Sequence, residues 1–175
     1  MLSVPDDLRE SFVNAVRMAG ARPGMRDSIY EVYDCVRVEV ESNKPACSAS
    51  GRCCRFGEYG HKLFVTTAEL GVFLSEVDYQ GKTPSGKSRL PILANDACPY
   101  QSDRLCGVHP IRPLGCRLFY CDPLSTQWQQ SAYERLHYEL KRLHERSDVP
   151  YFYVEWLAAL AAMRERASVS RASGF

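Results

Sequence analysis

Seven of the eight cysteines lie in one stretch of the sequence, residues 47–121. They are Cys47, Cys53, Cys54, Cys98, Cys106, Cys116 and Cys121. The run CSASGRCC, residues 47–54, holds three of them, and the runs around the others are polar and rich in turn residues. Thiols clustered in such settings are typical of metal ligation, by zinc or by an iron–sulfur cluster. Cys35 lies outside this stretch, beside an apolar stripe, so we interpret it as a small buried hydrophobic residue.

The run CGVHPIRPLGCR, residues 106–117, places two thiols around a proline-containing turn. Pro113 suits the first position of a short helix, which would put Cys116 about one turn further on. Arg112 and Arg117 lie on either side of Cys116 in the sequence. Their guanidinium groups are expected to lower thiolate pKa values and to offset the charge left when four thiolates bind a +2 metal. Both arginines are therefore candidate cofactor-binding residues.

The cysteine pattern resembles that of the YkgJ-type cysteine-cluster family, whose members are described as zinc- or iron-chelating domains. Family sequences run C-x-x-C-x-x-C-C, then C-P, then C-x-(I/V)-(Y/H)-x-x-R-P-x-x-C-R. The second part is matched by Cys98, Pro99, Cys106, Val108, His109, Arg112, Pro113, Cys116 and Arg117. The resemblance covers residues 47 to about 121 and implies a metal-binding role. It also places Cys47, Cys53 and Cys54 on the first, third and fourth family cysteines, with Ser50 where the second would stand.

The donor chemistry narrows the candidate ligands. A serine hydroxyl is a poor ligand compared with a thiolate, so we do not expect Ser50 to bind the metal. Adjacent side chains tend to point apart, so Cys53 and Cys54 need not serve one ion. The predicted core set is Cys47 or Cys54 together with Cys53, Cys98, Cys106 and Cys116, with Cys121 as an additional candidate and His109 as a weaker one. Zinc and an iron–sulfur cluster both remain open, and the spread of the ligands with surplus cysteine nearby slightly favours the cluster.

The length and charge of the chain limit what else it can be. A chain of 175 residues fits one domain, 1–175, and a formal net charge of +1 gives no field that would attract nucleic acid or an anionic membrane surface. Pro5, Asp6 and Asp7 stand where a secretory signal would need apolar residues, and the run WLAALAAM at 156–163 is far below the roughly 20 residues of a membrane span. We therefore expect a cytoplasmic protein, where metal ligation is favoured over disulfides.

Hydrophobic periodicity predicts a mainly α fold with little β structure: helical flanks, 1–46 and 122–175, around an irregular cysteine-rich metal-binding middle, 47–121. One helical face holds Ile29, Val32, Tyr33, Val36 and Val40, although the alternation at 36–40 would also suit a strand. Residues 61–66 suit a short strand, and Thr66 with Glu69 forms a capping-box signature for a helix to about Val77. Further stripes predict a helix of about 20 residues, with Tyr133, Leu136, Leu140 and Leu143, and a last helix beginning at Pro150, with Phe152, Trp156, Leu160 and Met163.

Three functional classes follow from these residues. The first is a small metal or iron–sulfur protein that acts as a carrier, sensor or accessory protein, with a possible protein partner. The second is a redox or protein-modifying enzyme that uses the centre, although the sequence offers no clear acid–base pair to complete a catalytic site. The third is a structural-zinc module that binds partners through its C-terminal helices.

Overall fold

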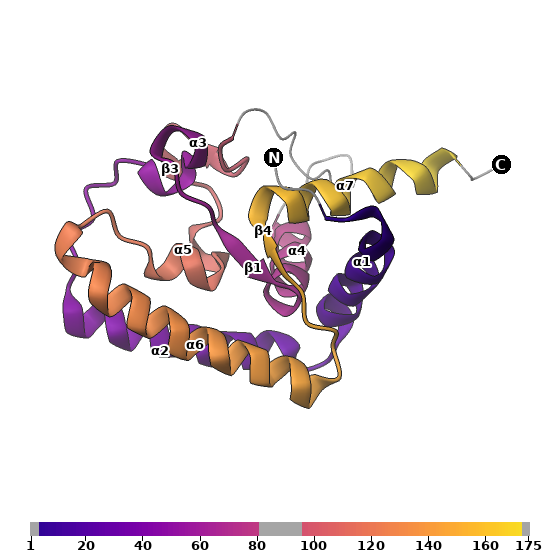
Figure 1. The fold of residues 1–175 in the computed structure, drawn as a ribbon, viewed down its shortest axis with the longest axis horizontal. Coiled ribbons are helices and arrows are strands. Elements are labelled where there is room, and N and C mark those ends of the chain that lie inside the picture. Colours follow the sequence, from indigo (N-terminus) through magenta and orange to yellow (C-terminus); the bar gives the residue numbers. More distant parts are fainter. Residues whose placement is uncertain (1–3, 81–95, 173–175) are drawn as a thin grey trace.

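The prediction of a mainly α fold is confirmed. A computed structural model describes residues 4–80 and 96–172, with side chains described for 4–77 and 96–164. It contains 66% helix and 7% strand, and the strands form only two short antiparallel pairs (Figure 1). Within the described residues, no helix combines the length and the apolar character needed to cross a membrane.

Two of the helices, α1 (Asp6–Ala21) and α4 (Thr67–Gln80), cross at a pair of glycines. A Cβ atom added to Gly71 would lie 2.6 Å from the carbonyl oxygen of Val16 and 2.8 Å from the Cβ of Ala19. A Cβ on Gly20 would lie 2.8 Å from the carbonyl oxygen of Gly71. The backbones of α1 and α4 therefore touch directly, and neither glycine leaves room for a side chain.

The two longest helices, α2 (Met25–Asn43) and α6 (Thr126–Ser147), run side by side along one edge of the molecule (Figure 1). Their apolar faces bury Ile29, Tyr33 and Val36 from α2 against Leu136 and Leu140 from α6. Both predicted helices are thus confirmed, and the alternative strand at residues 36–40 is wrong. The prediction that Cys35 is buried is also wrong, because Cys35 lies beside the buried stripe rather than on it and is exposed.

The short strands β1 (Phe64–Thr66) and β4 (Tyr153–Glu155) pair antiparallel at the centre of the molecule, with Val65 opposite Val154. This pairing corrects the predicted start of the last helix. Residues 150–155 are not helical, and α7 (Trp156–Ala172) begins only where Glu155 caps it by accepting hydrogen bonds from the N–H groups of Leu157 and Ala158.

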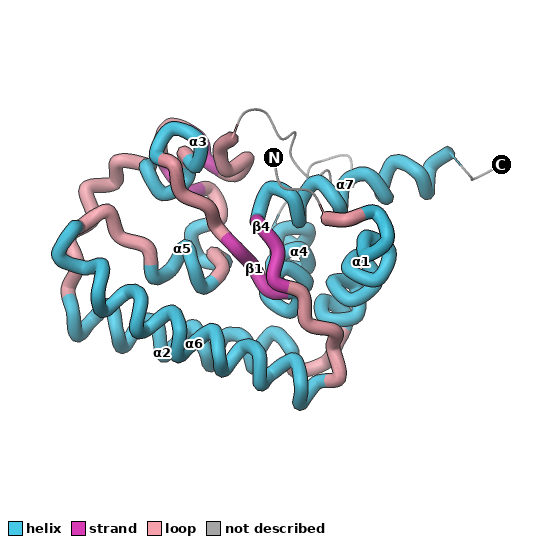
Figure 2. Tube along the Cα trace, in the orientation of Figure 1, coloured by secondary structure: helices cyan, strands magenta, loops and turns pink. Residues whose placement is uncertain are grey.

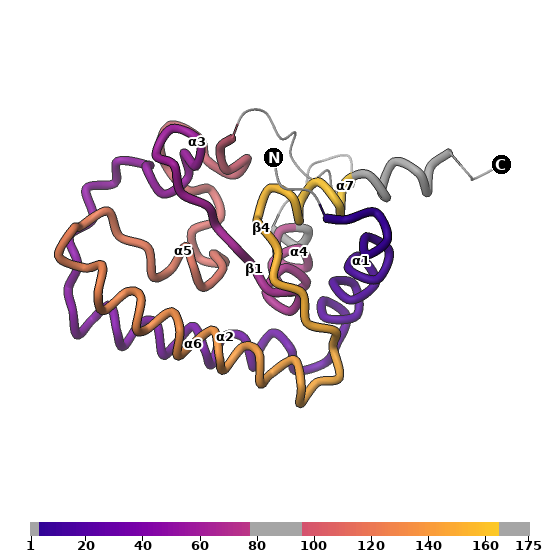
Figure 3. Tube along the Cα trace, viewed as in Figure 1, coloured from indigo at the N-terminus to yellow at the C-terminus, as the bar shows by residue number. Residues whose placement is uncertain are grey.

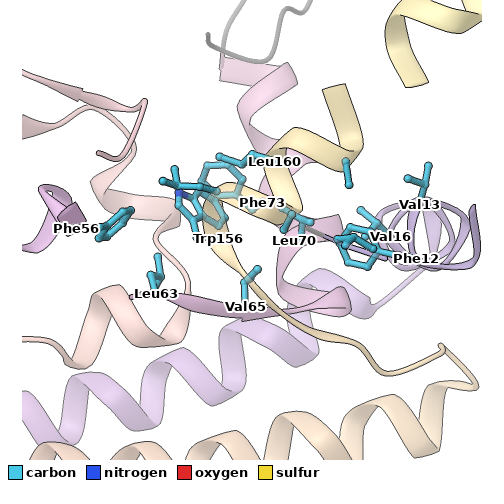
Figure 4. Close-up of a cluster of buried hydrophobic side chains, with 14 of the residues drawn as sticks. Phe12, Val13, Val16, Phe56, Leu63, Val65, Leu70, Phe73, Trp156 and Leu160 are labelled. Carbon is cyan, nitrogen blue, oxygen red and sulfur yellow. The ribbon is translucent and has the colours of Figure 1, made fainter. Parts of the chain in front are cut away.

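Apart from β1 and α4, the described part of the cysteine-rich middle consists of short elements joined by loops, which occupy one end of the molecule (Figure 2). In chain order they are η1 (Arg52–Cys54), α3 (Phe56–Tyr59), β2 (Gln101–Ser102), β3 (Leu105–Cys106), η2 (His109–Ile111) and α5 (Leu114–Leu118), and η3 (Pro123–Ser125) follows just after the middle. They pack on a hydrophobic core in which Trp156 lies between Phe56 on one side and Phe73 on the other (Figure 4).

Candidate metal centre

Five of the predicted ligand cysteines meet at one cavity of about 20 Å³. They are Cys53, Cys54, Cys98, Cys106 and Cys116. The cavity is closed by apolar groups from the core, including Phe56, Val108 and Trp156, and by Arg112. Cys47 and Cys121 are exposed and do not line this cavity, and neither do His109 and Ser50. The structure thus brings together four members of the predicted core set and Cys54, the alternative to Cys47.

Backbone hydrogen bonds hold the first two parts of the cavity wall together. Gly51 begins the η1 turn with a φ of 70°, a conformation that favours glycine, and the turn presents Cys53 and Cys54. The Cys54 carbonyl then accepts a hydrogen bond of 2.7 Å from the N–H of Cys98. The side chain of Gln101 adds a second link by donating to the Gly51 carbonyl at 2.8 Å. Segments more than 40 residues apart in the sequence are joined here (Figure 3).

Cys106 is placed by a tight hairpin that the sequence analysis did not predict. Strands β2 and β3 pair Gln101 with Cys106 and Ser102 with Leu105, which leaves a two-residue turn. Both turn residues, Asp103 and Arg104, have positive φ angles, of 51° and 66°. Such angles at both positions are those of a type I′ turn, the turn that suits the twist of two-residue hairpins. The hairpin directs Cys106 towards the sulfurs of η1.

Cys116 is placed by the short helix α5, which begins at a buried carboxylate. Glu69, 3% exposed, accepts a 2.7 Å hydrogen bond from the N–H of Leu114, the first residue of α5. The same carboxylate also accepts from the N–H and hydroxyl of Thr66, which confirms the predicted capping box, and from the hydroxyl of Tyr33. Helix α5 starts one residue after Pro113, so Cys116 lies one turn inside the proline turn, close to the predicted arrangement.

The sulfur atoms interact with one another around Cys54. Its Sγ lies 4.0 Å from the Sγ of Cys53, and its thiol also interacts with Cys98 and Cys106. Hydrogen bonding from Cys54, with help from the charge of Arg112, lowers the pKa of Cys53 and of Cys106 to about 6 each. The hydrogen bonds that Cys54 donates to Cys106, Cys53 and Cys98 raise its own pKa. Cys53, Cys98 and Cys106 therefore favour the thiolate form, whereas burial raises the pKa of Cys116 well above its usual range.

The two predicted arginines take different positions. Arg112 lines the cavity, where its charge favours the thiolate forms of Cys53 and Cys106. Arg117 instead donates to the carbonyl oxygens of Arg112 and Pro110, at 2.5 and 2.6 Å, and its guanidinium lies 4.0 Å from the centre of the Tyr33 ring. Arg117 therefore braces the turn that carries Arg112, and Arg112 is the arginine placed to compensate thiolate charge.

Trp156 supplies a polar group that the sequence analysis missed. It is 1% exposed and lines the cavity, and its Nε1–H interacts with the Cys98 thiol, which helps to lower the pKa of Cys98. This contact does not reach hydrogen-bond geometry within the described residues, so the buried N–H is poorly satisfied, which is costly. An anionic sulfur at this position would satisfy the N–H. Only the apolar stripe of the last helix was visible in the sequence, and nothing in that pattern indicates which way the indole nitrogen points.

The described thiols do not surround a point from which three or more of them could bind one metal ion. Among the described residues, no group of three or more His, Cys, Asp or Glu side chains has an arrangement that could hold a metal ion as it stands. The 4.0 Å between the sulfurs of Cys53 and Cys54 is nevertheless close to the roughly 3.8 Å that separates two sulfurs on a tetrahedral zinc with Zn–S bonds of about 2.3 Å. A change of χ1 rotamer is one way to bring further sulfurs to such distances.

Comparison of the chain with protein-family models, curated proteins and solved structures found no match. The resemblance to the YkgJ-type family stays a prediction.

Proposed function

We propose that this protein binds a metal centre through thiolates drawn from Cys53, Cys54, Cys98, Cys106 and Cys116. The observation that carries the proposal is the convergence of five thiols, from segments far apart in the sequence, on one small cavity. Free cysteines can be buried as small hydrophobic residues, but five around one void with an arginine beside them form a donor set rather than a packed core. The resemblance to zinc- or iron-chelating domains supports the same role.

Zinc suits the size of the cavity. A volume of about 20 Å³ exceeds the roughly 10–15 Å³ that one water-sized guest requires, so the cavity has room for a single ion. Four thiolates around Zn²⁺ form a closed structural site, and the fifth thiol would remain outside the coordination sphere.

An iron–sulfur cluster suits the number and setting of the donors. Four thiolates hold such a cluster as well, and hydrogen bonds to its sulfurs are one of the features that set its reduction potential. The N–H of Trp156, which is poorly satisfied by Cys98, is positioned to supply one of these bonds. A cluster is larger than one ion, so its binding requires the thiols to move apart.

A carrier, sensor or accessory role fits the surroundings of the centre best. The described groups that line the cavity are thiols, apolar side chains and Arg112, with no carboxylate and no histidine among them. Such a lining can hold and tune a metal, and thiols that bind the metal are not available to a substrate as general acids or bases. The alternatives are a redox or protein-modifying enzyme that uses the centre and a structural-zinc interaction module.

The direct test is the metal content and absorption spectrum of protein purified without oxygen. Visible charge-transfer absorption with iron and acid-labile sulfide would identify a cluster. A colourless protein with about one zinc per chain would identify a structural zinc site. Protein that contains neither metal, and that gains no metal when the reduced chain is titrated with zinc or iron, would contradict the proposal.

A further inference from the structure

A second pocket of about 240 Å³ adjoins the thiol cavity. The two share Cys53, Phe56 and Cys116 as lining residues. The volume is just below the roughly 300–1,000 Å³ of typical small-molecule sites, so its guest must be small. Nothing in the metal-binding role uses this space.

Flat aromatic surfaces form the walls of the pocket. The rings of His61 and Phe119 stack with centroids 5.0 Å apart and an interplanar angle of 11°, and those of Phe64 and Tyr153 stack at 5.1 Å and 23°. His61 is held in place by a hydrogen bond from its Nε2 to the Cys53 carbonyl, at 3.3 Å. Stacked walls of this kind favour a planar aromatic guest over a bulky aliphatic one.

A cation lies at the pocket. Lys62 lines it, is exposed, and forms no ion pair with any described residue, and no carboxylate from the described part of the chain lines the pocket. The Lys62 ammonium group attracts an anion, whereas the Cys53 thiolate, on the wall shared with the thiol cavity, repels one, so a bound anion would face Lys62.

One hydroxyl proton at the pocket is also left over. The hydroxyl oxygens of Tyr133 and Tyr153 lie 2.7 Å apart, so one donates to the other. The accepting tyrosine keeps its own O–H, for which the described residues provide no acceptor. The pocket therefore combines flat walls, one cation and one free O–H donor.

We propose that this pocket binds a small planar aromatic carboxylate, with the ring between the aromatic walls and the carboxylate facing Lys62 and the Tyr133–Tyr153 pair. Binding itself does not depend on a metal. That the guest would lie next to a metal centre, because the pocket and the thiol cavity share Cys53 and Cys116, rests on the proposed function.

The test uses 2-naphthoate as the probe and 2-naphthamide as its uncharged counterpart, titrated by calorimetry into the full-length protein with its metal content measured in the same sample. We expect saturable 1:1 binding of 2-naphthoate. Lys62→Gln should weaken that binding about fivefold, the effect of losing roughly 1 kcal/mol from a charge pair, and should leave 2-naphthamide unchanged. Lys44→Gln removes an exposed lysine that does not line the pocket and should change neither.

The tyrosine pair provides an independent arm. Tyr153→Phe alone leaves the Tyr133 proton free for the guest, so we expect less than a twofold change. The double variant Tyr133→Phe/Tyr153→Phe leaves no donor and should bind about fivefold more weakly. Absence of saturable 2-naphthoate binding to folded protein would overturn the inference, and so would equal affinity in wild type, Lys62→Gln and the double variant. Metal retained in those samples would leave the proposed function standing, and loss of metal alone would leave the pocket inference standing.

Discussion

Glu69 is the residue through which the core positions the cysteine-bearing helix α5. Its Oε2 accepts hydrogen bonds from the N–H and hydroxyl of Thr66, at 3.0 and 2.9 Å. Its Oε1 accepts from the N–H of Leu114 at 2.7 Å and from the hydroxyl of Tyr33 at 3.3 Å. All four partners donate, so Glu69→Gln must turn an NH₂ group towards at least one N–H.

The cost follows from that mismatch. A buried N–H left without an acceptor costs about 1–3 kcal/mol. Part of the loss is offset because the variant no longer buries a charge, whose desolvation raises the pKa of Glu69 in the wild type. We therefore expect Glu69→Gln to lower the free energy of unfolding by about 2 kcal/mol.

Urea unfolding followed by far-UV circular dichroism measures this change, and metal content measured on the same preparation reports the effect on Cys116. Loss of the hydrogen bond to Leu114 should loosen α5, so metal retention should fall with stability. Glu41→Gln is the matched control, because Glu41 is exposed and, among the residues that the structure describes, pairs only with Arg37 on its own helix, at 3.2 Å. We expect that control to change stability by less than about 0.5 kcal/mol. A Glu69→Gln protein as stable as the control would refute this reasoning.

Three further perturbations test other parts of the structure. Gly71→Ala should destabilise the protein by about 1–3 kcal/mol in urea unfolding, because the α1 backbone lies against this position. This holds although alanine is intrinsically the better helix former by about 1 kcal/mol. A gain in stability would show that the helices separate freely. His144 is buried, donates through Nδ1 to one backbone carbonyl and accepts at Nε2 from a backbone N–H, and burial lowers its pKa. As the pH falls below about 6.5, this histidine takes up a proton in the unfolded chain before it does so in the folded protein. The free energy of unfolding should therefore fall between pH 7 and about 5.5, and His144→Gln should flatten that dependence. An identical slope in the variant would count against a neutral His144. Trp156→Phe removes the N–H at the thiol cavity and should speed the loss of metal to a chelator. Trp128 does not line the cavity, so Trp128→Phe should release metal at the wild-type rate. Equal release rates in the two variants would exclude a bond from the indole to the centre.

The helices of this fold could be predicted from the sequence because their signals are local. The stripes on α2 and α6 repeat with the helical period, and the Thr66–Glu69 box marks the start of α4 within four residues. The start of α7 could not be predicted in the same way. Residues 153–155 are drawn into a strand by β1, almost 90 residues earlier, and no local pattern announces that partner. The prediction for Cys35 was wrong because Cys35 lies next to the buried face of α2. Successive residues of a helix point in different directions, so a residue adjacent to a buried one can be exposed.

The candidate site, too, could be predicted only where its features depend on local sequence. The clustering of cysteines and the proline turn before Cys116 are visible in the sequence, because they depend on residue type and spacing. Which thiols share a cavity depends on contacts across the fold. The Cys98–Cys54 backbone bond and the Asp103–Arg104 turn, which lacks the usual glycine, carry no strong sequence signal. The donor at Trp156 depends on the orientation of one ring in the core, which only the packing fixes.

The most direct test of the proposed centre is the amount of metal bound per chain in cysteine variants purified without oxygen. We predict that Cys35→Ser, at an exposed position outside the cavity, keeps the wild-type metal content. Cys98→Ser and Cys106→Ser should each lose most of the metal and part of the folded structure, because binding of a structural metal is coupled to folding. Equal metal content in wild type, Cys35→Ser, Cys98→Ser and Cys106→Ser, measured on soluble protein, would contradict the assignment of these thiols as ligands.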